Sequence, residues 1–290
     1  MIARETAHSA VVEFALDELR GAWGATDARN RSYLANRDER NDRMRRSDDP
    51  SWYGGLRSLA AAESLLTDGW RDGAERLART ANEIAPPTAR SRRRKPVWSH
   101  DGDDLGVDRA LTGAWDTAWR SSRRVWSAGP SHVTVYANFG GNAARDADAL
   151  FYSGAAALIV ADRLEEAGYS VRLVASSNIT SNSQADRRAM RADIVVKESE
   201  APIQVDAIAS VMCHAGIYRT FGFAAIAAVP GDIGENLGRE GTFTAFRAQY
   251  EAAGEWPEGA VVLDSAYDRE SCVESIKRAL VNVESPEGDS

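Results

Sequence analysis

The chain has 290 residues, of which 43% are hydrophobic and 27% are charged, and its formal net charge is −8. This composition is typical of a folded globular protein and excludes a chain that is disordered throughout. No apolar run approaches the ~20 residues that span a bilayer, and the N-terminus lacks the apolar centre of a secretory peptide. We therefore expect no membrane partner and a cytoplasmic location.

The charges are unevenly divided along the chain. Residues 1–130 hold 22 basic and 20 acidic side chains, whereas residues 131–290 hold 13 and 23. Two regions of different character are therefore expected. The only cysteines, Cys213 and Cys272, both lie in apolar segments, which favours buried thiols over a disulfide.

The first region is predicted to be mainly helical. Val11, Val12, Leu16, Leu19 and Trp23 recur at helical spacing, so a helix is expected over residues 6–23. The charge-dense segment 27–51 is expected to be a solvated arm or a mobile loop. Turn signals at Gly54–Gly55 and Asp68–Gly69 then predict a helical hairpin over residues 51–87.

Trp52 and Trp70 stand near the turns of this hairpin and are expected to anchor it. A cationic run follows, formed by Arg90, Arg92, Arg93, Arg94 and Lys95. It fits either an exposed charged linker or a surface that binds nucleic acid. Residues 105–126 return to a helical period, whose tryptophans are expected in a core or on a docking surface.

From residue 131 strands and helices alternate, which predicts a doubly wound, mainly parallel α/β sheet. Residues 177–192 lack the apolar period of a crossover helix, so the strands on either side are expected to pair as an antiparallel ribbon at one edge. We predict an α-helical N-terminal region over 1–128, an α/β domain over 129–284 and a disordered tail over 285–290. The expected strands are 132–137, 169–176, 192–199, 222–230 and 259–265, and the expected helices are 144–168, 202–221, 242–254 and 269–283.

The stretch "NFGGNA" ends the first strand of this sheet, at the edge where open α/β sheets bind ligands. A phosphate site would need G-x-G-x-x-G or G-x-x-x-x-G-K-[ST], and neither spacing is present. In a purely structural interpretation, Gly140 and Gly141 allow a tight turn, while Asn138 and Asn142 bond the loop and cap the helix.

The order of first strand, turn, long helix and antiparallel edge strand resembles the von Willebrand factor type A fold. In that family the turn reads Asp-x-Ser-x-Ser and binds Mg²⁺. The resemblance places Asn138, Gly140 and Asn142 at these positions and Asp232 near the family's second Asp. A neutral amide and a glycine attract a hard cation weakly, so the resemblance implies a degenerate metal site, with no cofactor expected or at most weakly bound Mg²⁺.

Two further motifs resemble uncharacterised phage and prophage proteins. These are "WYGG…GWRDG" over residues 52–73 and "VMCHAGIYRTFGF", which contains His214, Arg219 and Phe223. His214 follows Cys213, but adjacent helical residues point about 100° apart, so the two do not form a catalytic pair. We interpret His214 as a helix-end histidine bonded to the backbone or to a carboxylate.

These observations favour a non-enzymatic interaction or assembly protein of a phage or mobile element, located in the host cytoplasm or the virion. Its expected partner is a phage assembly component or, by analogy with type A domains, an AAA+ ATPase. The alternatives are nucleic-acid binding through the Arg-rich segments and a Mg²⁺-dependent hydrolase at the Asn138–Asn142 turn.

Overall fold

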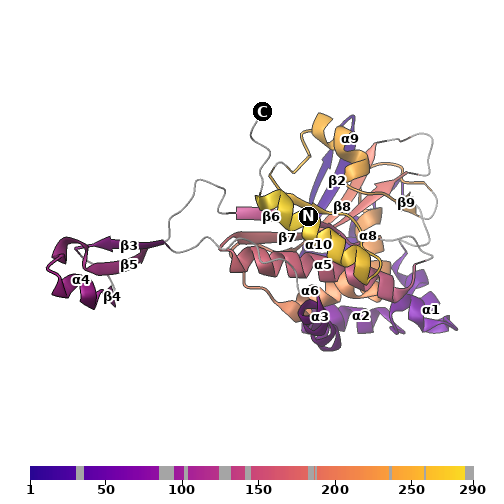
Figure 1. Cartoon of the computed structure of the whole chain (residues 1–290). Helices are drawn as coiled ribbons and strands as arrows, with labels where there is room; N and C mark the ends of the chain where they lie inside the picture. The colour runs from indigo at the N-terminus through magenta and orange to yellow at the C-terminus, as the bar shows by residue number, and fades with distance from the viewer. Residues whose placement is uncertain are drawn as a thin grey trace.

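The computed structural model describes residues 1–30, 36–84, 95–100, 104–123, 132–140, 145–181, 186, 188–234, 237–257 and 259–284 (Figure 1). None of the helices within these ranges has the length and apolar character needed to cross a membrane.

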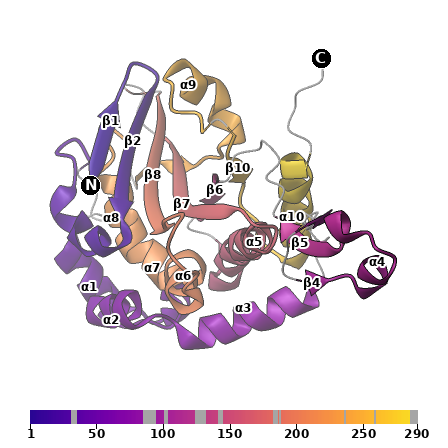
Figure 2. The same cartoon turned by 90° about the vertical axis from the view of Figure 1, so that its left-hand side faces the viewer.

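A seven-stranded sheet lies at the centre of the main body, in the order β1-β2-β8-β7-β6-β10, and β9 also pairs with β7 (Figure 2). Neighbours are parallel in the pairs β2–β8, β7–β6 and β6–β10, and antiparallel in the other three. This mixed sheet, flanked by helices, confirms the predicted α/β class. Its strands are β1 (Ile2–Glu5), β2 (Ser9–Ala15), β6 (His132–Asn138), β7 (Ser170–Thr180), β8 (Ala189–Lys197), β9 (Arg239–Glu240) and β10 (Val261–Leu263).

One face of the sheet is covered by a thick helical layer that contains the main hydrophobic core. Its longest helix, α5 (Ala147–Glu166), is buried along most of its length, and Asp146 caps it by accepting a hydrogen bond from the Ala149 N–H at 2.7 Å. The sequence predicted this helix correctly because its apolar residues occupy nearly every position. Its neighbours in the layer are η1 (Leu16–Ala25), α6 (Val205–Cys213), α7 (Ala215–Ile217), the π-helical turn η5 (Tyr218–Gly222), α8 (Phe223–Ala227) and α10 (Arg269–Glu284).

The opposite face carries a smaller cover made of η7 (Thr244–Phe246) and α9 (Arg247–Ala252). Phe243 and Tyr250 pack there against Val11 and Ala189 of the sheet. The cover makes this end of the second face a closed interior, where polar side chains of the strands must find partners within the protein.

The predicted helical hairpin is present as α2 (Leu59–Asp68) and α3 (Arg71–Glu83), which pack on the outer side of α6. The segment before it is not the solvated arm that we expected. Its second half forms α1 (Arg37–Arg46), which begins at Asn36 and buries Arg40 and Met44. The 3-10 turn η3 (Pro50–Tyr53) leads into the hairpin.

The predicted helix over residues 6–23 is wrong, because β2 occupies its first half and pairs in parallel with β8. Both faces of β2 are buried, so a nearly continuous apolar run mimicked a helical period, while its β-branched valines favour a strand. The predicted division at residue 128 is also wrong for this part of the chain, since β1 and β2 belong to the same sheet as β6 to β10.

Two further predictions need correction. Strands β7 and β8 are antiparallel as expected, but β8 is not at an edge because β2 covers its outer side. The apolar segment 222–230 contains α8 rather than a strand. It is alanine-rich and buried on all sides, and a short apolar run of this kind does not distinguish a strand from a buried helix.

Residues 95–123 form a small module with its own three-stranded sheet, in the order β3-β5-β4, which Figure 1 draws beside the main body. The continuous helical period expected over 105–126 is wrong, because two short helical elements lie between two of these strands and a strand follows them. The elements are β3 (Lys95–Ser99), β4 (Asp104–Leu105), α4 (Val107–Leu111), η4 (Trp115–Thr117) and β5 (Trp119–Arg123).

Candidate functional site

Asn138, the last residue of β6, is 1% exposed and has its side-chain amide engaged inside the protein. Its Nδ2 donates to the Gly241 carbonyl at 3.1 Å and to Ser265 Oγ at 2.8 Å. Its Oδ1 faces the Asn178 N–H at 3.5 Å. The amide therefore joins β6 to β7 and to the segments that follow β9 and β10.

The neighbours of Asn138 at this edge were not predicted from the sequence. Ser265 Oγ lies 3.3 Å from the Gly140 carbonyl and 3.1 Å from Glu240 Oε1, and the Tyr267 hydroxyl donates to the same carboxylate oxygen. Ser265 follows β10, the strand that pairs directly with β6. The sequence does contain a cue, the polar pair Asp264–Ser265 directly after the apolar strand 261–263. That cue does not show that the strand lies beside β6, because the strand order cannot be read from the sequence.

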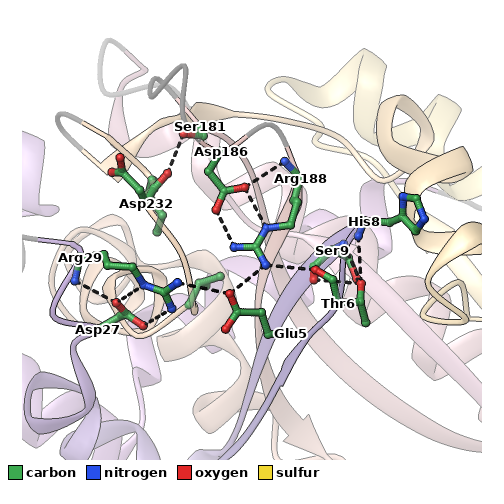
Figure 3. A network of polar contacts seen from close by, with 12 residues as sticks. Glu5, Thr6, His8, Ser9, Asp27, Arg29, Ser181, Asp186, Arg188 and Asp232 are labelled. Atoms are coloured by element: carbon green, nitrogen blue, oxygen red, sulfur yellow. Dashed lines mark hydrogen bonds and ion pairs between the residues drawn. The ribbon is translucent and has the colours of Figure 1, made fainter.

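Asp232 lies in a different set of contacts from Asn138, beside Ser181 (Figure 3). Its carbonyl accepts a hydrogen bond from Ser181 Oγ at 2.8 Å, and its Oδ1 accepts from the Gly234 N–H at 3.0 Å. The predicted fourth strand before it is α8, so Asp232 does not follow a strand beside β6. The resemblance placed Asp232 at a ligand position because segment 222–230 was expected to be a strand, and that segment contains a helix.

The polar network drawn in Figure 3 ties the β1–β2 hairpin to the connection between β7 and β8. Arg188 bonds Asp186 at 2.6 Å and Glu5 at 2.9 Å, and Glu5 is also 3.3 Å from Arg29. Hydrogen bonds from Arg188 hold the pKa of the Asp186 carboxyl below its usual range. The positive charges of the two arginines are neutralised by the neighbouring carboxylates. The network therefore holds the hairpin and the β7–β8 connection together as a structural contact.

The described residues of this turn, Asn138 and Gly140, do not supply the charged oxygen ligands of the family's Mg²⁺ site. Asn138 uses both ends of its amide internally, Gly140 has no side chain, and Asn142 lies outside the described residues. In the described ranges, no three His, Cys, Asp or Glu side chains are grouped so that they could hold a metal ion. Mg²⁺ prefers charged oxygens in near-octahedral geometry, and Asn138 with Gly140 does not supply them.

His214 ends α6 and begins α7, where its Nδ1 accepts a hydrogen bond from the Gly216 N–H at 3.1 Å. Its ring packs edge-on against Trp70 at 4.6 Å. Burial lowers the pKa of this imidazole to about 4, which keeps it neutral and able to accept the bond. His214 is therefore the backbone-bonded, helix-end histidine expected from the sequence.

Arg219 is 1% exposed and connects the hairpin region to the start of α5. Its two terminal nitrogens donate to the carbonyls of Trp52 and Arg145, and its guanidinium lies 4.4 Å over the Trp52 ring. Burial lowers its pKa to about 10. A group held by two carbonyls and an aromatic face is a positioning element of the fold.

The glycines of the "WYGG…GWRDG" motif lie where the hairpin region meets α6 and α7. A Cβ on Gly54 (φ 61°) would lie 2.8 Å from His214 Cε1, and one on Gly69 (φ 77°) would lie 2.9 Å from Asp206 Cβ. Gly73 lies directly against the Trp70 ring. The glycines of the motif thus allow the hairpin to pack closely on α6 and α7. The tryptophans of the motif anchor the hairpin, as predicted.

The cationic run falls mostly outside the described residues, which exclude Arg90, Arg92, Arg93 and Arg94. Lys95 is described as the first residue of β3, and it pairs across the antiparallel ribbon with Arg123 of β5.

The opposite end of the small module presents two large apolar side chains to solvent. Leu111 is 81% exposed and Trp115 is 60% exposed, the highest values among the large hydrophobic residues of the described segments. A helix-ending turn holds them, in which the Gly113 N–H donates to the Ala110 carbonyl and the Ala114 N–H to the Arg109 carbonyl. With Gly113 at φ 80° this is a Schellman turn, so an ordered turn presents both side chains.

The fold and these contacts define a mixed α/β protein in which the first strands and a helical hairpin are integral to one core. The chain belongs to the family described as Domain of unknown function (DUF7192), whose family model matches residues 13–281. Comparisons with curated proteins and with solved structures found no match. The matched range includes the strand β2 from Glu13 onward, the hairpin and the small module, so the family unit extends across the predicted boundary at residue 128.

Proposed function

We propose that this protein is a non-enzymatic interaction or assembly protein that docks on a partner protein through the exposed end of the small module. The observation that carries the proposal is the pair Leu111 and Trp115, 81% and 60% exposed on an ordered turn. Large apolar side chains on the surface cost free energy in water and mark interaction sites when they are grouped. Tryptophan is also among the residues most enriched at binding hot spots.

The turn itself favours a binding role. Hydrogen bonds at 3.1 Å and 2.9 Å fix the backbone between Leu111 and Trp115. A preformed turn loses little conformational entropy when a partner covers it, so more of the contact energy appears as affinity.

The resemblance to type A domains and to phage proteins supports the rest of the proposal. The succession β6, α5, β7 and antiparallel β8 keeps the chain order on which the resemblance rests, while β2 takes the edge side of β8. The partner is then a phage assembly component or, by fold analogy alone, an AAA+ ATPase. In this proposal the Asn138 edge has a structural role.

The test compares affinity capture by the intact chain with capture by the Leu111→Ser, Trp115→Ala double variant, in cells that naturally make the protein. We expect at least one captured protein to fall by tenfold or more, because a Trp hot spot contributes about 2 kcal/mol or more to binding. Direct titration with that protein, once purified, must then reproduce the loss of affinity.

A matched control replaces two exposed valines of the main body, as Val205→Ser with Val281→Ser. Their side chains are 37% and 57% exposed. Capture should be unchanged with this control, and both variants should keep the melting temperature of the parent. If every captured protein is recovered equally with both variants, the module end is not the docking surface and the proposal fails.

A further inference from the structure

Strand β1 lies at one edge of the central sheet, beside β2 (Figure 2). Its side chains bury little surface, since Ile2 is 55% exposed, Ala3 and Glu5 are also exposed, and Arg4 is only partly buried. Strand β2 is different, because its apolar side chains are buried on both faces of the sheet. Apolar burial therefore fixes β2 in place but contributes little to the attachment of β1.

Ion pairs attach the side chains of β1 to distant parts of the chain. Arg4 Nε lies 2.8 Å from Glu255 Oε1, in the segment that follows α9. Glu5 Oε1 lies 2.9 Å from Arg188 Nη1 and 3.3 Å from Arg29 Nη1 (Figure 3). The side chains of Glu5 and Arg29 are 41% and 47% exposed, so salt in the solvent reaches this part of the network. Exposed ion pairs of this kind are individually weak.

The odd-numbered residues of β2 direct their backbone groups toward β1. The Thr6 N–H donates to the Ser9 carbonyl at 2.8 Å, which closes the hairpin. Because backbone groups alternate in direction along a strand, the N–H groups of Val11 and Glu13 also face β1, opposite Arg4 and Ile2 in the register. Their protection from solvent therefore depends on the presence of β1.

The even-numbered residues of β2 direct their backbone groups toward β8. The Ala189 N–H donates to the His8 carbonyl at 3.1 Å, where the parallel pair begins. The same alternation turns the N–H groups of Ala10 and Val12 toward β8. These two amides lose their partners only if β2 separates from β8, so they report on the sheet itself and not on β1.

We propose that β1 is an ionic strap, a strand that opens and closes over the edge of β2 while the rest of the sheet stays folded. The salt concentration sets how often the strap is open, because salt screens the exposed ion pairs that help to hold it. Local opening is least costly where few apolar contacts are lost, and β1 has few of them. An open strap leaves the backbone groups of Ser9, Val11 and Glu13 as an unpaired strand edge, which is the kind of edge that pairs with other chains. The strap therefore controls access to the edge of an apolar strand.

The test measures amide hydrogen exchange by NMR on the full chain at pH 7, in 10 mM and in 1 M sodium chloride, between which the Debye length falls from about 30 Å to about 3 Å. We expect the exchange rates of the Val11 and Glu13 amides to rise by about fivefold or more in high salt, because the screened ion pairs no longer hold the strap closed. The rates of the Ala10 and Val12 amides should change by less than about twofold, since apolar burial fixes the pairing of β2 with β8.

The variant Glu5→Gln removes the charge that pairs with Arg29 and Arg188. In low salt it should raise the exchange rates of Val11 and Glu13 relative to those of Ala10 and Val12 by about fivefold or more, and it should reduce their further increase with salt. A general loss of stability would raise all four rates together and leave this ratio unchanged.

The matched control is Glu251→Gln, which makes the same chemical change in an exposed ion pair of α9. Glu251 lies 2.7 Å from Arg247 Nε, and the two side chains are 47% and 60% exposed. Because this pair does not contact β1, the ratio of the exchange rates should stay within about twofold of the parent value.

Three results would overturn the proposal. The first is exchange of Val11 and Glu13 that is as slow as that of Ala10 and Val12 at both salt concentrations, which would show that β1 leaves only when the whole sheet unfolds. The second is faster exchange of Val11 and Glu13 that changes neither with salt nor in Glu5→Gln, which would show that the ion pairs do not hold β1. The third is an equal change of the ratio in Glu5→Gln and Glu251→Gln.

Discussion

Arg191 and Asp193 form an ion pair inside the protein, where Arg191 Nε donates to Asp193 Oδ2 at 2.8 Å and the side chains are 2% and 0% exposed. Ser176 donates to the other oxygen of Asp193. Burial raises the pKa of the Asp193 carboxyl. The guanidinium also lies 4.9 to 5.4 Å from the centres of three aromatic rings, those of Tyr136, Phe243 and Tyr250.

Replacing only one member of this ion pair should lower the stability of the fold strongly. Asp193→Asn leaves a buried guanidinium without its counter-charge and is expected to lower the free energy of unfolding by about 3–5 kcal/mol. The double change Arg191→Met with Asp193→Leu should recover a large part of that loss, because no unpaired charge remains. Urea denaturation of Arg191→Met, of Asp193→Leu and of the double variant gives the coupling energy between the two side chains. Additive losses would show that the two side chains do not act as a pair.

Protonation of His214 should destabilise the fold in mild acid. Its folded pKa of about 4 lies below the ordinary value of 6.5, so the unfolded chain binds a proton first. This contribution is fully present above pH 6.5 and is lost as the pH falls from about 6.5 to 4, by roughly 3 kcal/mol in total. Unfolding free energies measured across this range should follow that decline.

The variant His214→Asn supplies the matched comparison. Asparagine accepts the same N-terminal hydrogen bond at a helix start but does not titrate. Its stability should therefore depend less steeply on pH between 6.5 and 4, even though packing against Trp70 is reduced. Identical pH profiles for the two proteins would remove His214 as the origin of the acid sensitivity.

Gly216 should not tolerate a side chain, because a Cβ there would overlap the Tyr53 carbonyl of the docked turn and lie 2.6 Å from Leu56 Cδ1. Gly216→Ala is expected to cost about 1–3 kcal/mol by overpacking. Gly24→Ala is the control, since nothing lies within 4 Å of its added Cβ. Thermal unfolding should give a lower melting temperature for Gly216→Ala than for Gly24→Ala. Equal melting temperatures would mean that the turn at Tyr53 moves aside freely.

Lys197 is a buried cation, and its loss should lower the free energy of unfolding more than the loss of an exposed lysine. It is 2% exposed, pairs with Glu165 at 2.6 Å and donates to the Val171 carbonyl at 2.7 Å. Lys197→Met keeps the stem but leaves these acceptors without a donor, which should cost about 1–3 kcal/mol. Lys277→Met removes an exposed pair with Glu274 and should cost less than about 0.5 kcal/mol. Similar losses in chemical denaturation would contradict this ranking.

The sequence was most informative where one physical signal dominated. The long apolar period of 147–166, the turn glycines of the hairpin and the β-branched run at 132–138 each specify an element almost alone, and the structure contains all three. Position in the sheet was harder to predict. Strand β2 reads like a helix because both of its faces are buried: Val12 lies in the main core, and Val11 packs on the other face against Phe243.

The environment of the Asn138 edge was only partly predictable for a related reason. Its location at the end of the first strand of the α/β part follows from the strand-to-helix transition. Its partners follow from the pairing of β6 with β10, which places Ser265 beside Asn138. Asp232 was expected at the Asn138 edge because the apolar segment 222–230 was taken for the strand beside β6. The apolar character of a segment does not show which distant strand pairs with β6.

The parallel pairing of β2 with β8 joins Ser9 to Ala189, 180 positions along the chain. During synthesis β2 therefore leaves the ribosome long before β8 exists. At the usual rate of about 5–20 residues per second, that delay lasts on the order of ten seconds or more. Contacts between such distant segments also make folding slow. For this period the apolar strand β2 has only its short hairpin partner β1 beside it, so we expect the nascent chain to be a client for chaperones.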